Sequence, residues 1–145
     1  MRRVIQLREL KASRSRLRVS VVGDQERPLL ELEGEFDVDT VPEIDRFLRR
    51  VLGPLYHQEH LVIDLGRTTF IDSSFIGFVV RLSAAQRAKR RELLLVHPVG
   101  QVRRVLAIVG LPNIVPVFET LESALDSLLS DRLPVIPPAF RAAAS

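Results

Sequence analysis

The sequence predicts an α/β domain built on a mixed, mostly parallel sheet of about five strands with about four helices. Three observations lead to this fold class. The 145 residues are 46% hydrophobic and 27% charged, which is typical of a globular domain with a sizeable core. Two segments of alternating polarity open the domain. After them, short apolar segments alternate with segments of helical periodicity, an order that favours parallel strands joined by helices.

An N-terminal hairpin is predicted from the alternation. Apolar and polar residues alternate over 17–22, turn residues occupy 23–28, and a second alternating segment runs over 29–36. Residues 1–16 precede the hairpin, are rich in arginine and show no sustained period. They are expected to form a mobile basic extension with room for one short strand or helix.

The first helix is predicted to follow the hairpin. Residues 39–43 combine a capping residue, a proline and an acid, which favours a first helical turn. Apolar residues then recur at helical spacing until Gly53, where the helix is expected to end. The apolar segment 61–65 is predicted to be a strand buried on both faces.

The second half of the chain continues the alternation of helices and strands. A second helix is predicted from Asp72 or Ser73 through Arg90, with basic residues at the end where its dipole favours cations. The remaining predicted elements are a strand at 93–96, a helix at 99–109, a strand at 113–118 and a helix at 121–128. A Pro- and Ala-rich flexible tail is expected after them. The predicted division is a basic extension (1–16), one domain (17–129) and a tail (130–145).

Composition excludes several classes of function. Without cysteine there is no disulfide framework, cysteine zinc site or thiol nucleophile. No apolar segment approaches the roughly 20 residues that span a membrane, and no signal-peptide core follows the N-terminus, so a cytoplasmic protein is expected. The net charge is +3, but aromatic residues are not interleaved with the basic ones. A nucleic-acid interface is therefore disfavoured.

The chemically most distinctive segment is Asp72-Ser73-Ser74, which joins a predicted strand to a predicted helix. A serine there lies at the positive end of a helix dipole, beside free backbone N–H groups. Such a position stabilises a negative group, including a phosphate attached to the serine itself. An ordinary helix cap is the alternative that the residues alone leave open.

Enzymatic and metal-dependent alternatives find less support. A serine hydrolase needs a base beside Ser73, yet His57 and His60 are expected at the far end of the strand, and His97 has no evident orienting acid. Asp37 and the acids around it are interpreted as capping and turn residues, too few for a calcium loop. Neither of the familiar glycine-rich nucleotide-binding patterns occurs. No catalytic, cofactor or metal site is therefore predicted.

Three blocks of the sequence share the pattern of one known family. The first ends the second predicted strand, the second surrounds the serine turn, and the third covers the closing helix, strand and helix. They are Glu33-Gly34-Glu35-Phe36-Asp37 with Thr40; Val62-Ile63-Asp64-Leu65, Phe70-Ile71-Asp72-Ser73-Ser74 and Gly77; and Val102-Arg103-Arg104-Val105-Leu106, Gly110-Leu111, Val117-Phe118, Leu121, Glu122, Ala124 and Leu125. Over 17–129 the chain resembles the STAS family, specifically the bacterial anti-sigma factor antagonists.

That resemblance implies a STAS-like fold and a partner switch. The unphosphorylated antagonist captures an ATP-binding anti-sigma factor that is also a serine kinase, and a sigma factor is released. The kinase then phosphorylates the antagonist and ends the interaction, and a metal-dependent serine phosphatase resets it. Ser73 matches the acceptor serine. Because the ATP belongs to the kinase, the resemblance implies that this chain needs no cofactor.

The resemblance also assigns a docking surface. Asp72 is expected to orient the serine and its loop, and the neighbouring loop is expected at the same end of the sheet. The expected partner-binding residues are Glu35, Asp37, Thr40, Asp72, Ser73, Ser74 and Phe75. Phe75 departs from the family, because it stands where glycine is usual, and its ring is expected to narrow kinase access or to repack the loop.

Alternative functions remain open at this point. The first is a STAS domain that docks without phosphorylation, in a stressosome-like assembly or as a transporter-associated subunit, which Phe75 favours. The second is a small enzyme with Ser73 as nucleophile, and the third is nucleic-acid binding through residues 1–16. A homodimer through an edge strand or the extension is left open as well.

Overall fold

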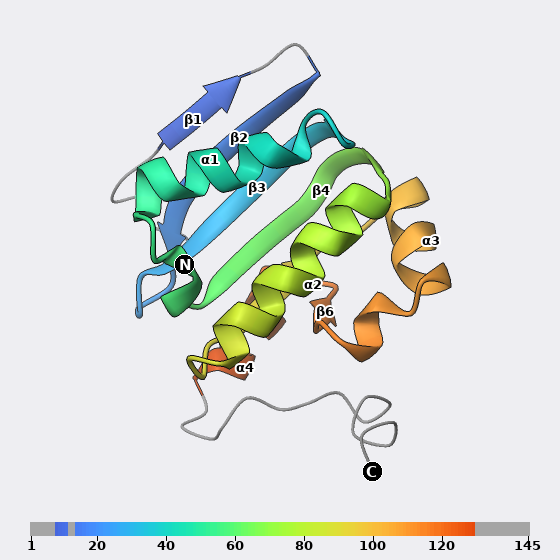
Figure 1. Cartoon of the computed structure of the whole chain (residues 1–145). Coiled ribbons are helices and arrows are strands. Elements are labelled where there is room, and N and C mark those ends of the chain that lie inside the picture. The colour runs from blue at the N-terminus through green and yellow to red at the C-terminus, as the bar shows by residue number, and fades with distance from the viewer. Residues whose placement is uncertain (1–7, 12–13, 130–145) are drawn as a thin grey trace.

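The structure, a computed structural model, describes residues 8–11 and 14–129. A six-stranded sheet in the order β1-β2-β3-β4-β5-β6 forms its centre (Figure 1). The strands are β1 (Arg8–Lys11), β2 (Ser15–Val22), β3 (Arg27–Phe36), β4 (Leu61–Ile71), β5 (Leu93–Val96) and β6 (Val117–Phe118). The helices are α1 (Val41–Leu52), α2 (Ser73–Arg87), α3 (Gly100–Ile108) and α4 (Leu121–Leu128), with short 3-10 turns η1 (Tyr56–Gln58) and η2 (Leu111–Asn113).

The strand pairing confirms the predicted fold class. β2 and β3 form the expected antiparallel hairpin, and β3, β4, β5 and β6 then pair in parallel. The sixth strand, β1, comes from the predicted extension and pairs antiparallel with β2. Residues 1–7, 12–13 and 130–145 lie outside the described residues. The division of the chain into extension, domain and tail therefore stays a prediction.

Helices cover the two faces of the sheet unequally. Helices α1, α2 and α3 pack on one face, where the larger core cluster gathers apolar residues such as Phe36, Ile63 and Phe75. Helix α4 packs on the other face through Ala124, against a smaller cluster that includes Val62. Figure 1 shows α1 and α2 in front of the sheet and α4 behind its lower part. No helix of the described residues covers the half of that second face nearer the carboxyl ends of β3 and β4.

Strand β4 is longer than the predicted strand at 61–65. It continues to Ile71 through residues 66–70, of which four are exposed, so apolar runs alone did not reveal it. The last strand is shorter than predicted, because Gly110 adopts a left-handed φ of 71° and η2 follows it. Helix α2 ends at Arg87, three residues before the predicted end at Arg90.

Because β4 is long, its carboxyl end lies beyond the end of β5 and beside the end of β3. Strand β5 pairs only with the first part of β4, up to Asp64. Beyond that point helix α3 packs against β4 in place of a strand. On its other side β4 stays paired with β3, and Phe36 is in register with Ile71. The two longest strands therefore end side by side, and the segments that follow them emerge at the same edge.

Candidate functional site

The turn between β4 and α2 is a well-formed helix start. Asp72 is extended (φ −132°, ψ −169°) and is the N-cap, and its Oδ1 accepts a hydrogen bond from the backbone N–H of Ser74 at 2.9 Å. Its backbone carbonyl accepts from the N–H groups of Phe75 and Ile76 at 3.1 and 3.2 Å. These bonds fix Ser73 as the first residue of α2, at the positive end of the helix dipole.

The residues of this turn differ in their solvent exposure. Ser73 is exposed, whereas Asp72 and Ser74 are half-buried. Phe75 is fully buried in the core between the sheet and α2. Its ring therefore packs inward and adds no exposed surface beside Ser73. The serine hydroxyl is left as an accessible side chain on a fixed backbone.

A residue that the sequence did not single out holds this turn from the other side. Gln101, in the first turn of α3, donates from Nε2 to the carbonyl of Ile71 at 3.0 Å and accepts from its N–H at 3.1 Å. The side-chain amide thus bonds Ile71 as a neighbouring strand would. No sequence signal marked it, because a single polar residue at a helix start has no periodicity.

The loop between β3 and α1 is held by its own polar side chains. The buried Thr40 hydroxyl donates to the carbonyl of Glu35 at 2.9 Å and accepts from the N–H of Asp37 at 2.8 Å. Asp37 Oδ1 in turn accepts from the backbone N–H groups of Asp39 and Thr40 at 2.9 and 3.2 Å. Asp37 and Thr40 therefore shape this loop, and the exposed acids are Asp39 within it and Glu35 at the end of β3.

Arg14, which directly precedes β2, pairs with the same loop at the open end of the hairpin, where Ser15 is in register with Gly34. Its Nη1 lies 2.8 Å from Asp37 Oδ2, and its Nη2 lies 3.3 Å from Asp37 Oδ1. The same guanidinium reaches Glu35 at 3.4 Å and Asp39 at 4.0 Å. Its hydrogen bond to the carboxylate, reinforced by backbone N–H donors, lowers the pKa of Asp37 to about 2. Arg14 lies among the residues assigned from the sequence to a mobile extension.

The two segments lie next to each other because β3 and β4 end in register. The register pairs Glu35–Phe70 and Phe36–Ile71 place the loop of residues 37–40 (the acidic loop) beside the turn of residues 72–74 (the serine turn). The structure therefore gathers the predicted residues at one edge of the sheet. Glu35 and Ser73 are exposed there, Asp37, Asp72 and Ser74 are half-buried, and Thr40 and Phe75 are buried.

The three histidines lie outside the serine turn and the acidic loop. His97 does have an orienting acid, Asp64, with Nδ1 and Oδ1 3.3 Å apart. Asp64 lies seven residues before the end of β4, and at about 3.3 Å per residue this is roughly 20 Å from Ile71. His60 accepts a hydrogen bond from the N–H of Glu92 at 2.9 Å, and His57 lines a cavity beside α1. The predicted separation of His57 and His60 from Ser73 agrees with these positions.

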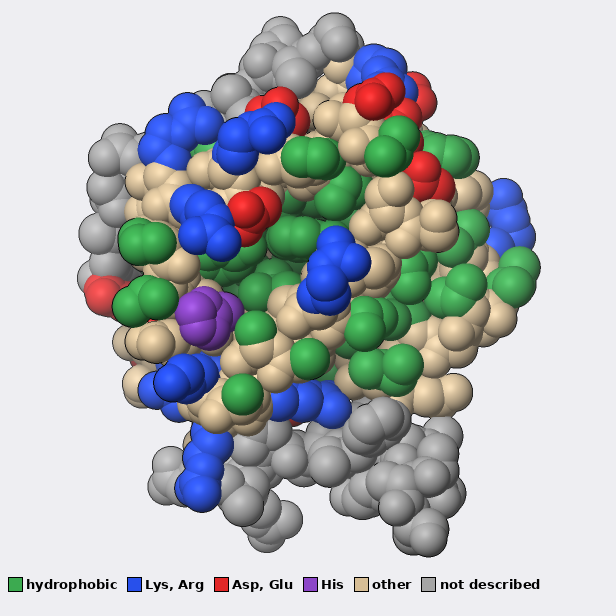
Figure 2. Space-filling model, viewed as in Figure 1, with side chains coloured by type: hydrophobic (Ala, Val, Ile, Leu, Met, Phe, Trp, Pro, Cys, Tyr) green, Lys and Arg blue, Asp and Glu red, His purple; other side chains and the backbone are tan. Residues whose placement is uncertain are grey.

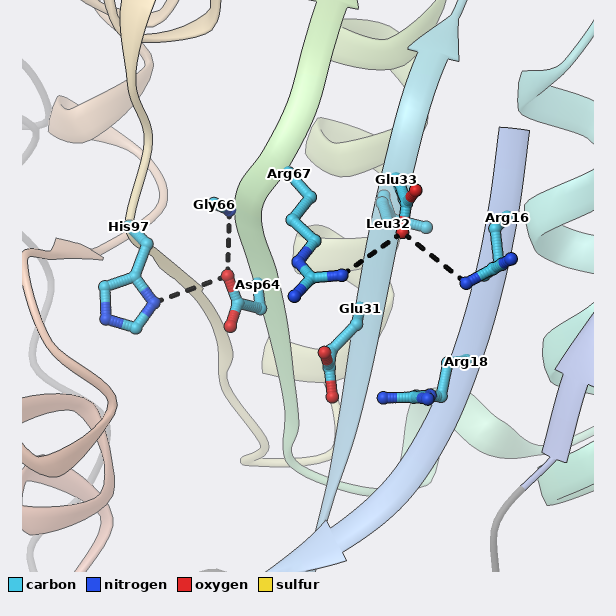
Figure 3. A pocket seen from close by; sticks show the side chains of 9 residues that line it. All are labelled: Arg16, Arg18, Glu31, Leu32, Glu33, Asp64, Gly66, Arg67 and His97. Atoms are coloured by element: carbon cyan, nitrogen blue, oxygen red, sulfur yellow. Dashed lines mark hydrogen bonds and ion pairs between the residues drawn. The ribbon is translucent and has the colours of Figure 1, made fainter. Parts of the chain in front are cut away.

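The Asp64–His97 pair belongs to a polar groove on the uncovered half of the sheet (Figure 3). The groove has a volume of about 270 Å³. Glu33 lies 3.9 Å from Arg16 and 3.7 Å from Arg67, so these charges form a row across three strands. Because the charges pair with one another, we interpret this face as a solvated surface.

A second cavity lies between α1 and α2. It has a volume of about 390 Å³, and Figure 2 shows hydrophobic side chains at its floor. Phe78 and Leu82 contribute to its lining, and Asp45 accepts from the hydroxyl of Tyr56 at 2.7 Å. Burial and this bond to a carboxylate raise the pKa of Tyr56 above its ordinary value. The tyrosine is thus a neutral donor that ties η1 to α1.

Neither a metal cluster nor a membrane span is found in the described part of the chain. Among residues 8–11 and 14–129, no group of three His, Asp or Glu side chains is arranged to hold a metal ion. The helices within the same ranges are too short or too polar to cross a bilayer.

The structure is similar to solved structures of anti-sigma factor antagonists. A proposed antagonist from Thermotoga maritima is 21% identical, with a TM-score of 0.63 over 77% of this chain and 93% of that one. The antagonist SpoIIAA in its unphosphorylated form is 23% identical, with a TM-score of 0.57 over 86% of this chain and 96% of that one. Phosphorylated Bacillus SpoIIAA is 21% identical, with a TM-score of 0.52 over 85% and 99%. At these identities the similarity establishes the fold.

The family follows from the sequence match. Residues 19–116 match the family model described as "Mlab, STAS domain". This segment extends from β2 to just before β6 and contains the acidic loop, the serine turn and Gln101. The match covers more than half of the chain. The protein therefore belongs to the STAS domain family.

Proposed function

We propose that this STAS protein is an anti-sigma factor antagonist that works by partner switching. In its unphosphorylated form it binds an ATP-dependent anti-sigma serine kinase in the cytoplasm, and the sigma factor is released. Phosphorylation of Ser73 ends the complex, and a metal-dependent serine phosphatase restores the first state. The chain is a binding module and a kinase substrate in this proposal, and the ATP is held by the kinase.

The observation that carries the proposal is the accessibility of Ser73 on an otherwise fixed turn. The hydroxyl is exposed, while the residues around it are held by the Asp72 cap and by Gln101. A kinase needs such an accessible hydroxyl, and a packed partner surface needs a fixed backbone. SpoIIAA, an antagonist of similar structure, has been solved in phosphorylated and unphosphorylated forms, and this supports the proposal of a phosphorylation switch.

A phosphate on Ser73 has opposite effects within the chain and at the interface. Within the chain, the α2 dipole stabilises the added charge. At an interface, nearly two negative charges would be buried beside Glu35, Asp39 and Asp72. Removing these charges from water is costly unless the partner supplies matching donors. The modified protein is therefore expected to fold normally but to release its partner.

A second candidate is a STAS subunit that docks without phosphorylation. It is favoured by the description of the matching family model, which names Mlab. The burial of Phe75 weighs against it, since the ring that departs from the family pattern leaves Ser73 exposed. Association of two copies stays a prediction in either case.

Two other hypotheses have less support. Nucleophilic catalysis by Ser73 needs a neighbouring base, and His97 is paired with Asp64 roughly 20 Å away by strand rise. Nucleic-acid binding through the N-terminal arginines would use exposed guanidinium groups. The two of these arginines whose side chains the structure describes both face acids: Arg14 is paired with Asp37, and Arg16 is near Glu33.

The test is binding of Ser73 variants to each ATP-binding anti-sigma serine kinase of the host, measured by calorimetry. Ser73→Ala should bind as tightly as the wild type. Ser73→Asp should bind about 100-fold more weakly, because a buried unpaired charge costs several kcal/mol. Ser74→Ala is the control and should bind normally. Unchanged binding of Ser73→Asp would support the constitutive subunit instead.

A further inference from the structure

The hydrogen bonds of the acidic loop lead to one residue outside it. Asp37 uses Oδ1 for the backbone of its own loop, and it uses both oxygens for the guanidinium of Arg14. A two-point pair between arginine and a carboxylate fixes orientation as well as distance. The loop beside Ser73 is thus fastened to a residue 23 positions earlier in the chain.

The backbone brings Arg14 to this position independently of its charge. The carbonyl of Arg14 accepts a hydrogen bond from the N–H of Glu35 at 3.1 Å. This close approach depends on Gly34, which has a φ of +103° and whose hypothetical Cβ would overlap the carbonyl oxygen of Arg14. Both the backbone and the side chain of Arg14 are therefore fixed against the end of β3.

We propose that Arg14 is a positioning residue for partner binding, which holds the loop of residues 37–40 in the conformation that docks beside Ser73. The inference rests on the proposed function, because the loop matters only if a partner contacts this edge of the sheet. Because Arg14 directly precedes β2, it also makes the start of the hairpin part of the docking surface. Without the guanidinium of Arg14, Asp37 keeps its backbone hydrogen bonds but loses its ion pair with the residue that precedes β2.

Arg16 provides a matched control two residues further along the chain, in β2. Its side chain is 36% exposed, against 39% for Arg14, and it also faces a glutamate. Its contact with Glu33 is a single approach of 3.9 Å in the groove of Figure 3, away from the loop. Arg16→Gln therefore removes the same charge from a neighbouring position without touching Asp37.

The experiment compares the wild type with Arg14→Gln, Arg14→Lys and Arg16→Gln by three measurements. These are the NMR titration of the Asp37 carboxyl, hydrogen exchange at the Thr40 and Val41 amides, and calorimetric affinity for the host anti-sigma serine kinases. In Arg14→Gln we expect the pKa of Asp37 to rise toward the ordinary value of about 4, with faster exchange at both amides. Kinase affinity should fall about tenfold, since the loop must then be ordered on binding.

The conservative variant distinguishes positioning from general stability. Lysine restores the charge but not the two-point geometry, so Arg14→Lys should recover part of the Asp37 titration and part of the affinity. Arg16→Gln should match the wild type in all three measurements.

The outcomes separate this inference from the proposed function. Wild-type affinity in Arg14→Gln would overturn the inference, whether or not the Asp37 titration changes. Equal losses in Arg14→Gln and Arg16→Gln would overturn it too, because the effect would then be one of net charge. If the wild-type protein binds none of the kinases, the proposed function fails. In that case the titration of Asp37 and the hydrogen exchange of the Thr40 and Val41 amides decide whether Arg14 orders the loop.

Discussion

Gln101 and Ile71 are joined by two hydrogen bonds, one to each backbone polar group of the isoleucine. The carboxamide of Gln101 accepts from the N–H at 3.1 Å and donates to the carbonyl at 3.0 Å. Strand β5 pairs with β4 only up to Asp64, so within the described residues no strand pairs with Ile71 on that side. The glutamine takes the place of the missing strand, one residue before the cap of α2.

Gln101→Met is expected to loosen the turn while preserving the volume of the side chain. Two backbone groups lose their partners, which should lower the free energy of unfolding by about 1–3 kcal/mol. Hydrogen exchange at the Ile71 amide should accelerate by more than global unfolding explains. Gln25→Met, at an exposed turn position, is the control and should change neither quantity. Unaltered exchange at Ile71 would contradict the assigned role.

Glycine substitutions test the close approach of Arg14 to β3. Gly34 and Gly53 both have positive φ, +103° and +95°, but only at Gly34 would a Cβ meet other atoms. Gly53→Ala should cost about 1–3 kcal/mol through backbone strain alone. Gly34→Ala should cost at least about 2 kcal/mol more, because the hairpin must shift away from Arg14. If Gly34→Ala and Gly53→Ala lower the free energy of unfolding equally in denaturant titrations, the overlap of the new Cβ with the Arg14 carbonyl is easily relieved.

Phe75 is expected to act through packing. Phe75→Ala should lower the free energy of unfolding by about 3–5 kcal/mol, because a fully buried ring is lost from the core. Phe75→Leu should cost much less and keep Ser73 available to a kinase. Phe70, which is 38% exposed two residues before Asp72, is the control, and Phe70→Ala should have a small effect on stability. A larger loss of stability in Phe70→Ala would refute this assignment.

His60 should make the protein less stable in mild acid. Burial, and then the positive charges of Arg27 and Arg91, lower the pKa of His60 to about 4, whereas an unfolded histidine titrates near 6.5. Between these pH values the unfolded chain binds a proton that the folded chain does not. The free energy of unfolding should therefore fall as the pH falls from about 6.5 to about 4.

The variant His60→Asn isolates this contribution. Asparagine can keep an acceptor for the N–H of Glu92 but does not titrate. Its stability should depend less steeply on pH across the same interval, in urea titrations at matched pH. The carboxyl of Glu92, whose pKa burial raises, titrates in both proteins and cancels in the comparison. Parallel curves would show that His60 is not responsible.

The sequence predicted the fold class and the place of the serine turn because both depend on local patterns. Alternation predicted the β2–β3 hairpin. The Asp72 cap, followed by apolar residues at helical spacing, predicted α2; these residues are Phe75, Phe78, Val79, Leu82 and Ala85. The same spacing also placed Phe75 on the core-facing side of α2, where the structure buries it. The second half of β4 was missed because most of its residues are exposed, so it has no apolar run.

Arg14 and Gln101 were missed for a different reason. Each acts on a segment that is distant in sequence, Arg14 on Asp37 and Gln101 on Ile71. Their partners are determined by the antiparallel register of the hairpin and by the packing of α3 against β4. A single sequence contains neither relationship, so one arginine among many and one glutamine at a helix start carried no signal.

The most direct test is intact-mass spectrometry with peptide mapping, after incubation with ATP and each anti-sigma serine kinase of the host. The partner-switching proposal predicts a single added phosphate on Ser73, absent from Ser73→Ala and present in Ser74→Ala. A phosphate on another residue, or none in the presence of a kinase that binds the protein, would contradict it. Ser73 would then be a docking residue of a constitutive STAS subunit.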